Sequence, residues 1–496
     1  MRTARIGDIR KLCISIACGG RRATAEIPTL VSLLLDSDAE MRETSAFALR
    51  FQCRNDPAAA MQVFYLNTGA ILNSDPAAEL ASELVRLAGT RAIDRLIAEL
   101  RAGVPLRRAS ACVLSRISPG IAKYNWAAVL EAAMLDDFVG SRMAQTIGEA
   151  YSGDCDDLQP LLGSSDSAVR CAGACALVRN GRIENGLPLL VAAMRQGAPE
   201  QRSMAAYGAA AIGRLAASAA EAAERLLSDD APESRAAALV LMTSIALDGG
   251  DGDEIARTTD KALSALDDPA YEVRSQAARL LGAIGPPLAL VGTEPLFRAA
   301  VERRGEGFFV SIPAVQALAS MGPAAVPLLC DRLAHDGDER YRAAAATTLG
   351  EIASDTASDT LRRAMGDSDW LVRLRCAAAL TTCGEPGTGC DYLRSAAADP
   401  DWKVRTQTAF ILGRLPGQDE FSATTLATAL DDSHPEVRRQ AVESFGRRGN
   451  AVKAIVPRLW GMLEDDDLAV RRQLLRSLQD LLLSDDRERL KVVTSY

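Results

Sequence analysis

Residues 399–415 read Asp399-Pro-Asp-Trp-Lys-Val-Arg405-Thr-Gln-Thr-Ala-Phe-Ile-Leu-Gly413-Arg-Leu415, and this phrase recurs along most of the chain. In most copies an Asp precedes the Arg by six residues, and Ala, a large apolar residue and often Gly follow at fixed offsets. The Arg position falls at residues 42, 107, 140, 170, 202, 235, 274, 311, 342, 373, 405, 438 and 471, with Gly140 and Ser311 as exceptions. The copies are mostly 30 to 33 residues apart, which indicates a stacked array of repeats.

Each copy predicts one amphipathic helix. Taking the Arg as position zero, Ala409 stands at offset four and Leu412 at offset seven. Offsets zero, four, seven and eleven lie on one face of a helix, and the small Ala lets a second helix pack closely. A second, shorter helix often begins with Pro, as at 327–329. Gly often follows the end of the helix that carries the phrase, as at Gly285 and Gly322. The repeating unit is therefore a pair of helices.

This pattern resembles HEAT repeats, in particular the type named after the phycobilisome lyases. The resemblance rests on Asp-x-Asp-x-x-Val-Arg followed by Ala-x-x-Leu-Gly, and it covers about residues 27–483. It implies an all-α fold, an α-solenoid of about fourteen helix pairs. It also implies a ladder between Asp and Arg side chains, whose acids would be Asp36, Asp229, Asp268, Asp336, Asp367, Asp399, Asp432 and Asp465.

The regularity of the repeats varies along the chain. We expect an N-terminal cap helix at 1–25, less regular repeats at 26–246, irregular repeats at 247–310, regular repeats at 311–483 and a charged tail at 484–496. The acidic, Gly-rich insertion at 248–254 is expected to be a solvated loop, because it lacks the ligand positions of a calcium-binding EF-hand. No linker is long enough to separate independent domains.

Composition excludes several classes of protein. The formal net charge is −9, whereas nucleic-acid binders usually carry a basic surface. No run of 18 apolar residues predicts a transmembrane helix. The 11 Cys form no Cys-x-x-Cys pair, which favours reduced thiols and a cytoplasmic location.

The chain offers few residues for catalysis or metal binding. It has two His, at positions 335 and 434, and both stand in Asp-rich turns. HEAT-repeat deoxyhypusine hydroxylases bind two irons through several His-Glu pairs, and this chain lacks that ligand set. Cys171 and Cys175 stand one helical turn apart without further Cys or His nearby, which favours a structural role. We expect neither enzymatic activity nor a cofactor.

A candidate partner site comes from the helix face opposite the buried stripe. Offsets one, five and nine carry nine Arg against five acids, and in a HEAT stack this face should line the concave side. The excess is concentrated in the last three repeats. The predicted partner-binding residues there are Arg414, Arg439, Arg447, Arg472, Arg476 and the adjacent Phe410. Arg side chains in such a row suit the carboxylates of an acidic protein segment.

These observations favour a non-catalytic scaffold or adaptor that binds a protein partner along its concave helix face. One alternative is a bilin lyase-like accessory factor acting on a chromophore-bearing protein, an analogy of repeat type alone. Another is a nucleic-acid-binding HEAT-like protein, against which the acidic chain speaks. Trp370 and Trp402 stand three residues before their Arg in adjacent turns, where they either pack on the next turn or form an aromatic row for a peptide.

Overall fold

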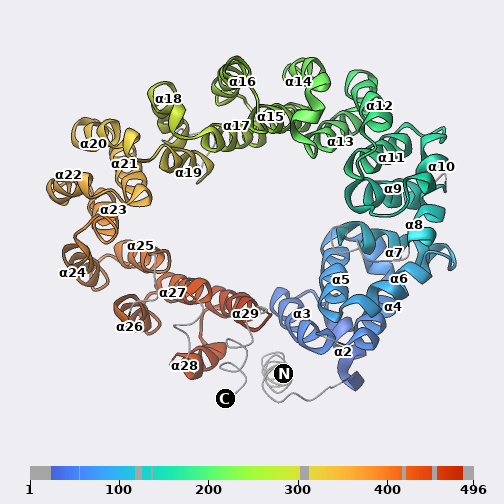
Figure 1. The fold of residues 1–496 in the computed structure, drawn as a ribbon. Helices are drawn as coiled ribbons and strands as arrows, with labels where there is room; N and C mark the ends of the chain where they lie inside the picture. Colours follow the sequence, from blue (N-terminus) through green and yellow to red (C-terminus); the bar gives the residue numbers. More distant parts are fainter. Residues whose placement is uncertain are drawn as a thin grey trace. The chain divides into compact units, whose positions relative to one another are not determined.

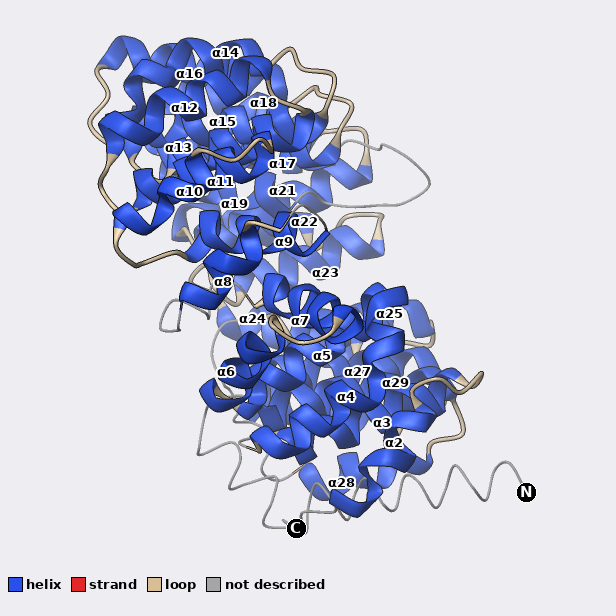
Figure 2. Ribbon diagram, turned by 90° about the vertical axis from the view of Figure 1, so that its right-hand side faces the viewer, coloured by secondary structure: helices blue, strands red, loops and turns tan. Residues whose placement is uncertain are grey.

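The computed structural model describes residues 24–54, 56–117, 126–135, 138–301, 312–415, 420–448 and 455–483. All secondary structure in these ranges is helical (Figure 2), which confirms the all-α fold. The predicted tail at 484–496, and all but the last two residues of the predicted cap at 1–25, lie outside the described residues.

The helices follow one another in pairs with short turns. Up to residue 284 they are η1 (Thr24–Glu26), α2 (Ile27–Leu33), α3 (Ala39–Cys53), α4 (Pro57–Asn73), α5 (Asp75–Ala88), α6 (Thr90–Glu99), α7 (Val104–Arg116), α8 (Trp126–Ala133), α9 (Phe138–Ala150), η3 (Cys155–Leu158), α10 (Gln159–Leu162), α11 (Ser167–Arg179), α12 (Ile183–Gln196), α13 (Pro199–Ala210), η4 (Gly213–Ala219), α14 (Ala220–Leu226), α15 (Pro232–Leu247), α16 (Gly252–Ala265) and α17 (Tyr271–Ile284).

Beyond residue 285 the helices are η5 (Pro286–Leu288), α18 (Ala289–Val301), α19 (Ile312–Ser320), η6 (Gly322–Ala325), α20 (Val326–His335), α21 (Glu339–Ile352), η7 (Asp355–Ala357), α22 (Ser358–Ala364), α23 (Trp370–Leu380), α24 (Pro386–Ala396), α25 (Trp402–Leu412), α26 (Glu420–Ala429), α27 (Pro435–Arg448), α28 (Val456–Gly461), η9 (Met462–Glu464) and α29 (Leu468–Leu483).

The chain divides into two compact units. Unit 1 contains Asp36–Phe47 and the described residues from Leu281 onward. Unit 2 contains Ala48–Leu280 and the described residues up to Leu35. Within unit 1, α20, α22, α24 and α26 form one row, and α21, α23, α25, α27 and α29 form a second row on its concave side (Figure 1). Each second-row helix carries one copy of the repeated phrase.

The two Asp of the phrase shape the turn before each second-row helix. Asp399 Oδ1 accepts a hydrogen bond of 2.8 Å from the backbone N–H of Asp401. Asp401 Oδ1 in turn accepts one of 2.9 Å from the N–H of Lys403, so Asp401 is the N-cap of α25. An N-cap carboxylate satisfies an N–H that has no partner within the helix and complements the helix dipole. The Asp-x-Asp spacing is therefore a turn followed by a cap.

The Arg of the phrase joins two successive turns. Arg405 donates to the backbone carbonyls of Asp399 at 2.8 Å and Pro400 at 3.1 Å in its own turn. Its remaining N–H groups donate to both carboxylate oxygens of Asp432 in the next turn, at 2.7 and 2.8 Å. The equivalent pairs Arg202–Asp229, Arg235–Asp268, Arg342–Asp367 and Arg438–Asp465 confirm the predicted ladder at five of its eight acids. The prediction is wrong at the other three: among the described residues Asp36 and Asp399 form no ion pair, and Asp336 pairs with Arg332 on α20.

The Gly of the phrase allows the second-row helices to approach one another. A Cβ on Gly413, which directly follows α25, would lie 2.4 Å from the hydroxyl oxygen of Ser444 on α27. A side chain there would force these two helices apart. The exit glycines have a different task, because Gly285 and Gly322 have φ of 72° and 62°. This left-handed conformation ends a helix at little cost only in Gly, as the sequence predicts.

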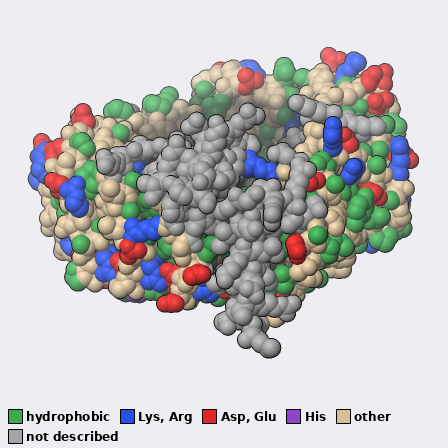
Figure 3. Space-filling model, turned by 90° about the horizontal axis from the view of Figure 1, so that it is seen from below, with side chains coloured by type: hydrophobic (Ala, Val, Ile, Leu, Met, Phe, Trp, Pro, Cys, Tyr) green, Lys and Arg blue, Asp and Glu red, His purple; other side chains and the backbone are tan. Residues whose placement is uncertain are grey.

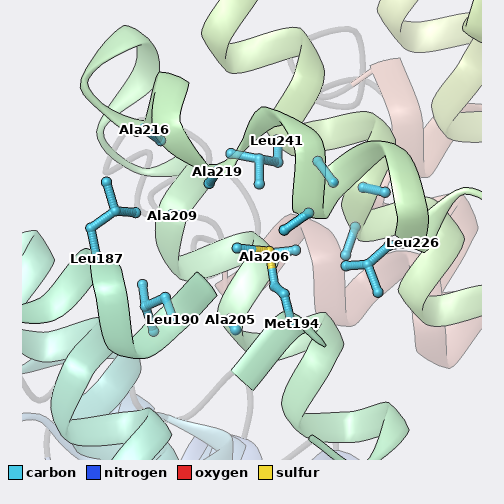
Figure 4. Packing of buried hydrophobic residues seen from close by; sticks show 14 of the residues in the cluster. Leu187, Leu190, Met194, Ala205, Ala206, Ala209, Ala216, Ala219, Leu226 and Leu241 are labelled. Carbon is cyan, nitrogen blue, oxygen red and sulfur yellow. The ribbon is translucent and has the colours of Figure 1, made fainter. Parts of the chain in front are cut away.

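Small side chains dominate the core of unit 2. Figure 4 shows part of the cluster formed by α11 to α15, in which Leu and Met side chains pack against fully buried Ala residues. The Ala members include Ala205, Ala206, Ala209 and Ala219. Because Ala adds little bulk, the helices pack closely, which explains why Ala is so frequent in the repeated phrase.

The acidic, Gly-rich insertion is more ordered than the sequence suggests. Residues 248–251 form the turn between α15 and α16, and residues 252–254 already belong to α16. Asp251 caps α16 by accepting from the N–H of Glu254 at 2.9 Å. Arg214 donates from its side chain to the carbonyl of Gly249 and from its backbone N–H to the carboxylate of Asp248. The expected solvated loop is thus a short, hydrogen-bonded turn.

In the described part of the chain, no single helix has the length and apolarity needed to cross a membrane. The segments Ile312–Ser320 and Gly322–His335 meet that requirement only when taken together, and the chain bends by 109° between them.

Candidate functional site

Two of the predicted partner-binding arginines are already neutralised within their own helix. Arg439 on α27 donates to the carboxylate of Glu436 at 2.6 and 3.0 Å, and it also lies 3.5 Å from Glu443. Arg447 donates to Glu443 at 3.0 Å. These pairs are spaced three or four residues apart, as ion pairs on one helix face usually are. Arg439 and Arg447 are therefore paired with acids of their own helix, and their role in partner binding stays a prediction.

Two further predicted residues, Arg472 and Arg476 on α29, face acids of helix α3 within unit 1. Arg472 Nε donates to Glu43 at 2.6 Å, and Arg476 lies 3.8 Å from the same carboxylate. Beside them, Arg471 donates to both oxygens of Glu40 at 2.9 Å. Glu40 thus takes the place that the next ladder Asp would have. Arg472 and Arg476 thus share the carboxylate of Glu43, and their role in partner binding stays a prediction.

Phe410 and Arg414 form a site of a different kind. The Arg414 guanidinium lies over the Phe410 ring at 4.4 Å from its centroid, and the guanidinium of Arg375 on α23 lies 5.7 Å from the same centroid. No carboxylate of the described residues forms an ion pair with either cation. We call Arg375, Phe410 and Arg414 the cationic site.

The electrostatics of the cationic site are unfavourable in the absence of an anion. Part of Arg375 stays accessible to solvent, yet desolvation lowers the pKa of its guanidinium to about 10, and the nearby charge of Arg414 contributes to this. Desolvation also lowers the pKa of Arg414, as does the charge of Arg447, whereas Glu443 and Glu351 act in the opposite sense. An anion bound near both guanidinium groups would counter their mutual repulsion and offset the desolvation of each.

Sequence reasoning missed Arg375. The predicted face contained offsets one, five and nine, and Arg375 stands at offset two from Arg373. At about 100° per residue, offset two lies at about 200° around the helix, opposite the buried stripe near 0°. Helix geometry alone would therefore have placed Arg375 on the face opposite the buried stripe. Of the predicted residues, the structure brings Phe410 and Arg414 together with Arg375 and pairs the other four arginines with acids.

The two Trp residues lie at a second surface, where the turns meet the starts of the second-row helices. Trp402 stacks on His434 of the next turn, with ring centroids 4.0 Å apart and planes within 4°. Its side chain nevertheless remains 36% exposed, and Trp370 is partly exposed. Trp402 thus packs on the next turn while part of its side chain stays exposed, and the aromatic row for a peptide stays a prediction.

The other His lies on α20. His335 Nδ1 is 2.9 Å from a carboxylate oxygen of Asp331, one helical turn earlier. Within the described ranges, no group of three or more His, Cys, Asp or Glu side chains is placed to hold a metal ion.

Comparison with known proteins identifies the repeats. A family model of HEAT repeats matches residues 259–346, 326–413, 390–479 and 423–494. No curated protein matches the chain significantly. The phycobilisome-lyase subtype stays a prediction, because the matching family model describes HEAT repeats in general.

Several solved structures match the chain at low identity. An engineered protein is 18% identical, with 92% of this chain and 98% of that chain covered and a TM-score of 0.25. Importin beta is 13% identical, with 98% of this chain and 72% of that chain covered and a TM-score of 0.37. A karyopherin bound to the extreme C-terminus of a protein phosphatase is 12% identical, with 95% of this chain and 66% of that chain covered and a TM-score of 0.46. From its own helices and the family match, the chain is an all-α solenoid that contains HEAT repeats.

Proposed function

We propose that the protein is a non-catalytic interaction scaffold that holds an acidic segment of a partner protein at the cationic site. The observation that carries this proposal is the pair of guanidinium groups of Arg375 and Arg414 over one Phe410 ring, without a carboxylate partner among the described residues. Most Arg side chains near this end of the chain are paired, as the ladder shows. The Arg375–Arg414 pair therefore stands out among the C-terminal repeats, although Arg108 and Arg142 lie over the Phe138 ring of unit 2 in a comparable way.

The geometry suits a carboxylate. A guanidinium presents parallel N–H donors that match the two oxygens of an Asp or Glu side chain. The Phe410 ring holds both guanidinium groups in place through cation–π contact, which reduces the entropy lost on binding. A carboxylate would also offset the desolvation of Arg375. Binding energy is then available without a rearrangement of the helices.

A protein segment fits this site better than a nucleic acid. The charges of Glu351 and Glu443 act on Arg414, and they would repel a continuous phosphate backbone. The formal net charge of −9 acts in the same direction. On the face seen in Figure 3, Lys and Arg side chains are intermixed with Asp and Glu. A short acidic segment can use two Arg without meeting these repulsive charges.

The test is a fluorescence anisotropy titration with a labelled Glu-rich peptide at low salt. We expect saturable binding that weakens as salt is added. Binding should be lost in Arg414→Glu. The Arg414 side chain is exposed, and circular dichroism checks that the variant folds. Binding no tighter than that of a neutral peptide of equal length, or full binding by Arg414→Glu, would contradict the proposal. Tighter binding of a single-stranded oligonucleotide than of the peptide would favour the nucleic-acid alternative instead.

The bilin lyase-like alternative rests on the repeat resemblance alone. Its test is a change in the visible absorbance of a bilin on mixing with the protein. An unchanged spectrum would exclude it.

A further inference from the structure

A cleft of about 580 Å³ opens along the starts of four successive second-row helices, α23, α25, α27 and α29. We call it the aromatic cleft. Its walls combine aromatic rings, a few aliphatic atoms and polar groups. The lining residues are Trp370, Trp402, Lys403, Thr406, Gln407, His434, Pro435, Glu436, Asp467 and Ala469.

The cleft begins where the ladder is interrupted. In its own turn, Arg373 donates to the carbonyls of Asp367 and Ser368, as Arg405 does to the two carbonyls of its turn. Its Nε, however, donates to the hydroxyl of Tyr392 at 3.1 Å, and the carboxylate of Asp399 forms no ion pair with a described residue. Helix α23 correspondingly packs against α25 far less extensively than α25 packs against α27. Because Arg373 and Asp399 form no ion pair, space is left for a ligand between Trp370 and Trp402.

The turns around the aromatic cleft are strongly acidic. The stretches 367–369, 399–401, 431–436 and 464–467 contain 11 acids and no Lys or Arg. Ladder and neighbouring arginines neutralise some of them. No ion pair to a described cation is formed by Asp369, Asp399, Asp401, Glu464, Asp466 and Asp467. Among the described residues that line the cleft, Lys403 is the only Lys or Arg, and its ammonium lies 6.0 Å from the centroid of the Trp402 ring.

We propose that the aromatic cleft binds an extended, basic segment of a partner protein. Exposed Trp faces attract Lys and Arg side chains, and the carboxylates of the surrounding turns complement the same charge. The cleft crosses the first turns of four helices, so an extended chain can place successive side chains along it. The contact of Lys403 with Trp402 shows the same kind of interaction within the molecule.

This surface is independent of the cationic site and has the opposite sign. The cationic site uses Phe410 and Arg414 near the C-terminal end of α25, whereas the aromatic cleft uses Trp402 at its N-terminal end. A partner with both acidic and basic segments could engage the two surfaces together. The two proposals can still fail separately, because their probes carry opposite charges.

The test uses a fluorescent peptide of alternating Lys and Gly and measures its affinity by anisotropy. We expect Trp402→Ala and Trp370→Ala each to weaken binding about tenfold. The matched control is Tyr271→Ala, because Tyr271 has the same position in its repeat and is 54% exposed but does not line the cleft. Tyr271→Ala should leave the affinity unchanged.

A second variant guards against misfolding of the Trp variants. Lys403→Glu removes the cation that competes for the Trp402 ring and adds a negative charge, so it should tighten binding several-fold. The proposal is overturned if Lys403→Glu has no effect, or if Tyr271→Ala weakens binding as much as Trp402→Ala. It is equally overturned if Arg375→Met with Arg414→Met alters the affinity for this basic peptide more than Trp402→Ala does.

Discussion

Arg405 bridges two successive repeats by donating two hydrogen bonds, of 2.7 and 2.8 Å, to the carboxylate of Asp432. The same guanidinium holds the carbonyls of its own turn. Both groups are largely buried, so a lost partner would not be fully replaced by water. This contact explains why the phrase needs Arg at one position and Asp six residues before the next Arg.

The first prediction concerns the ion pair between Arg405 and Asp432. Arg405→Ala should lower the free energy of unfolding of the C-terminal repeats by about 1–3 kcal/mol, since it leaves Asp432 and two carbonyls without their donor. Hydrogen exchange of α25 to α27, followed by mass spectrometry, would measure the loss locally. Arg373→Ala is the control, because Arg373 donates to the carbonyls of its own turn but forms no ion pair with a carboxylate of the next turn. The loss of unfolding free energy in Arg373→Ala should be smaller. Equal losses would mean that the turn contacts alone stabilise the stack.

The second prediction concerns acid stability. Burial is the largest single influence on the pKa of Asp432 and raises it, but the hydrogen bonds from Arg405 and from the backbone N–H of His434, together with the charge of Arg405, outweigh burial and hold the pKa below its usual value. The hydrogen bond from Arg342 likewise lowers the pKa of Asp367. A carboxyl whose folded pKa is depressed contributes stability above its unfolded pKa, near 4, and loses that contribution as pH falls through the folded value.

The C-terminal repeats should therefore unfold below about pH 4, and the midpoint in Arg405→Ala should lie at higher pH than in the wild type. A titration followed by circular dichroism measures both midpoints. An identical midpoint in the variant would show that Asp432 titrates without influence from Arg405.

The third prediction concerns the cost of an uncompensated cation. Arg375→Met should stabilise the protein by on the order of 1 kcal/mol, because it replaces a desolvated, unpaired guanidinium with an apolar chain of similar length. Arg342→Met should destabilise it, since Arg342 is paired with Asp367. Thermal melting of the two variants provides the comparison. Destabilisation by Arg375→Met would contradict the description of Arg375 as unpaired.

The fourth prediction concerns α29 and α3. Arg472→Glu would place two carboxylates together, because Glu43 now accepts a hydrogen bond from Arg472. Hydrogen exchange in Ala39–Cys53 should become faster, while the affinity for the acidic peptide stays unchanged. A large loss of affinity without faster exchange would restore Arg472 to the binding site.

The fold could be predicted from the sequence because each residue of the phrase performs a local task. Asp399 and Asp401 form a turn and a cap within a few residues, and Gly413 permits a helix contact at a fixed offset. These tasks repeat with the period of the chain. Their spacing is therefore visible without any knowledge of the contacts.

The site was only partly predictable. Glu436 and Glu443 stand three and four residues from Arg439, so their pairing could have been read from the helical spacing. The pairing of Arg472 with Glu43 could not, because 429 residues separate the two in the sequence. Whether an Arg finds a carboxylate is decided by packing between distant segments. A count of charges on one helix face does not contain that information.

The central claim is that the cationic site, and not the general charge of the protein, binds an acidic segment. Isothermal titration calorimetry of the Glu-rich peptide against Arg375→Met/Arg414→Met tests it most directly. The charge-matched control is Arg101→Met/Arg225→Met, which removes two arginines already paired with Glu131 and Glu221. We predict a loss of affinity of about 10- to 100-fold in the first variant and less than about twofold in the control. Equal losses in the two variants would show that binding follows net charge alone and would contradict the claim.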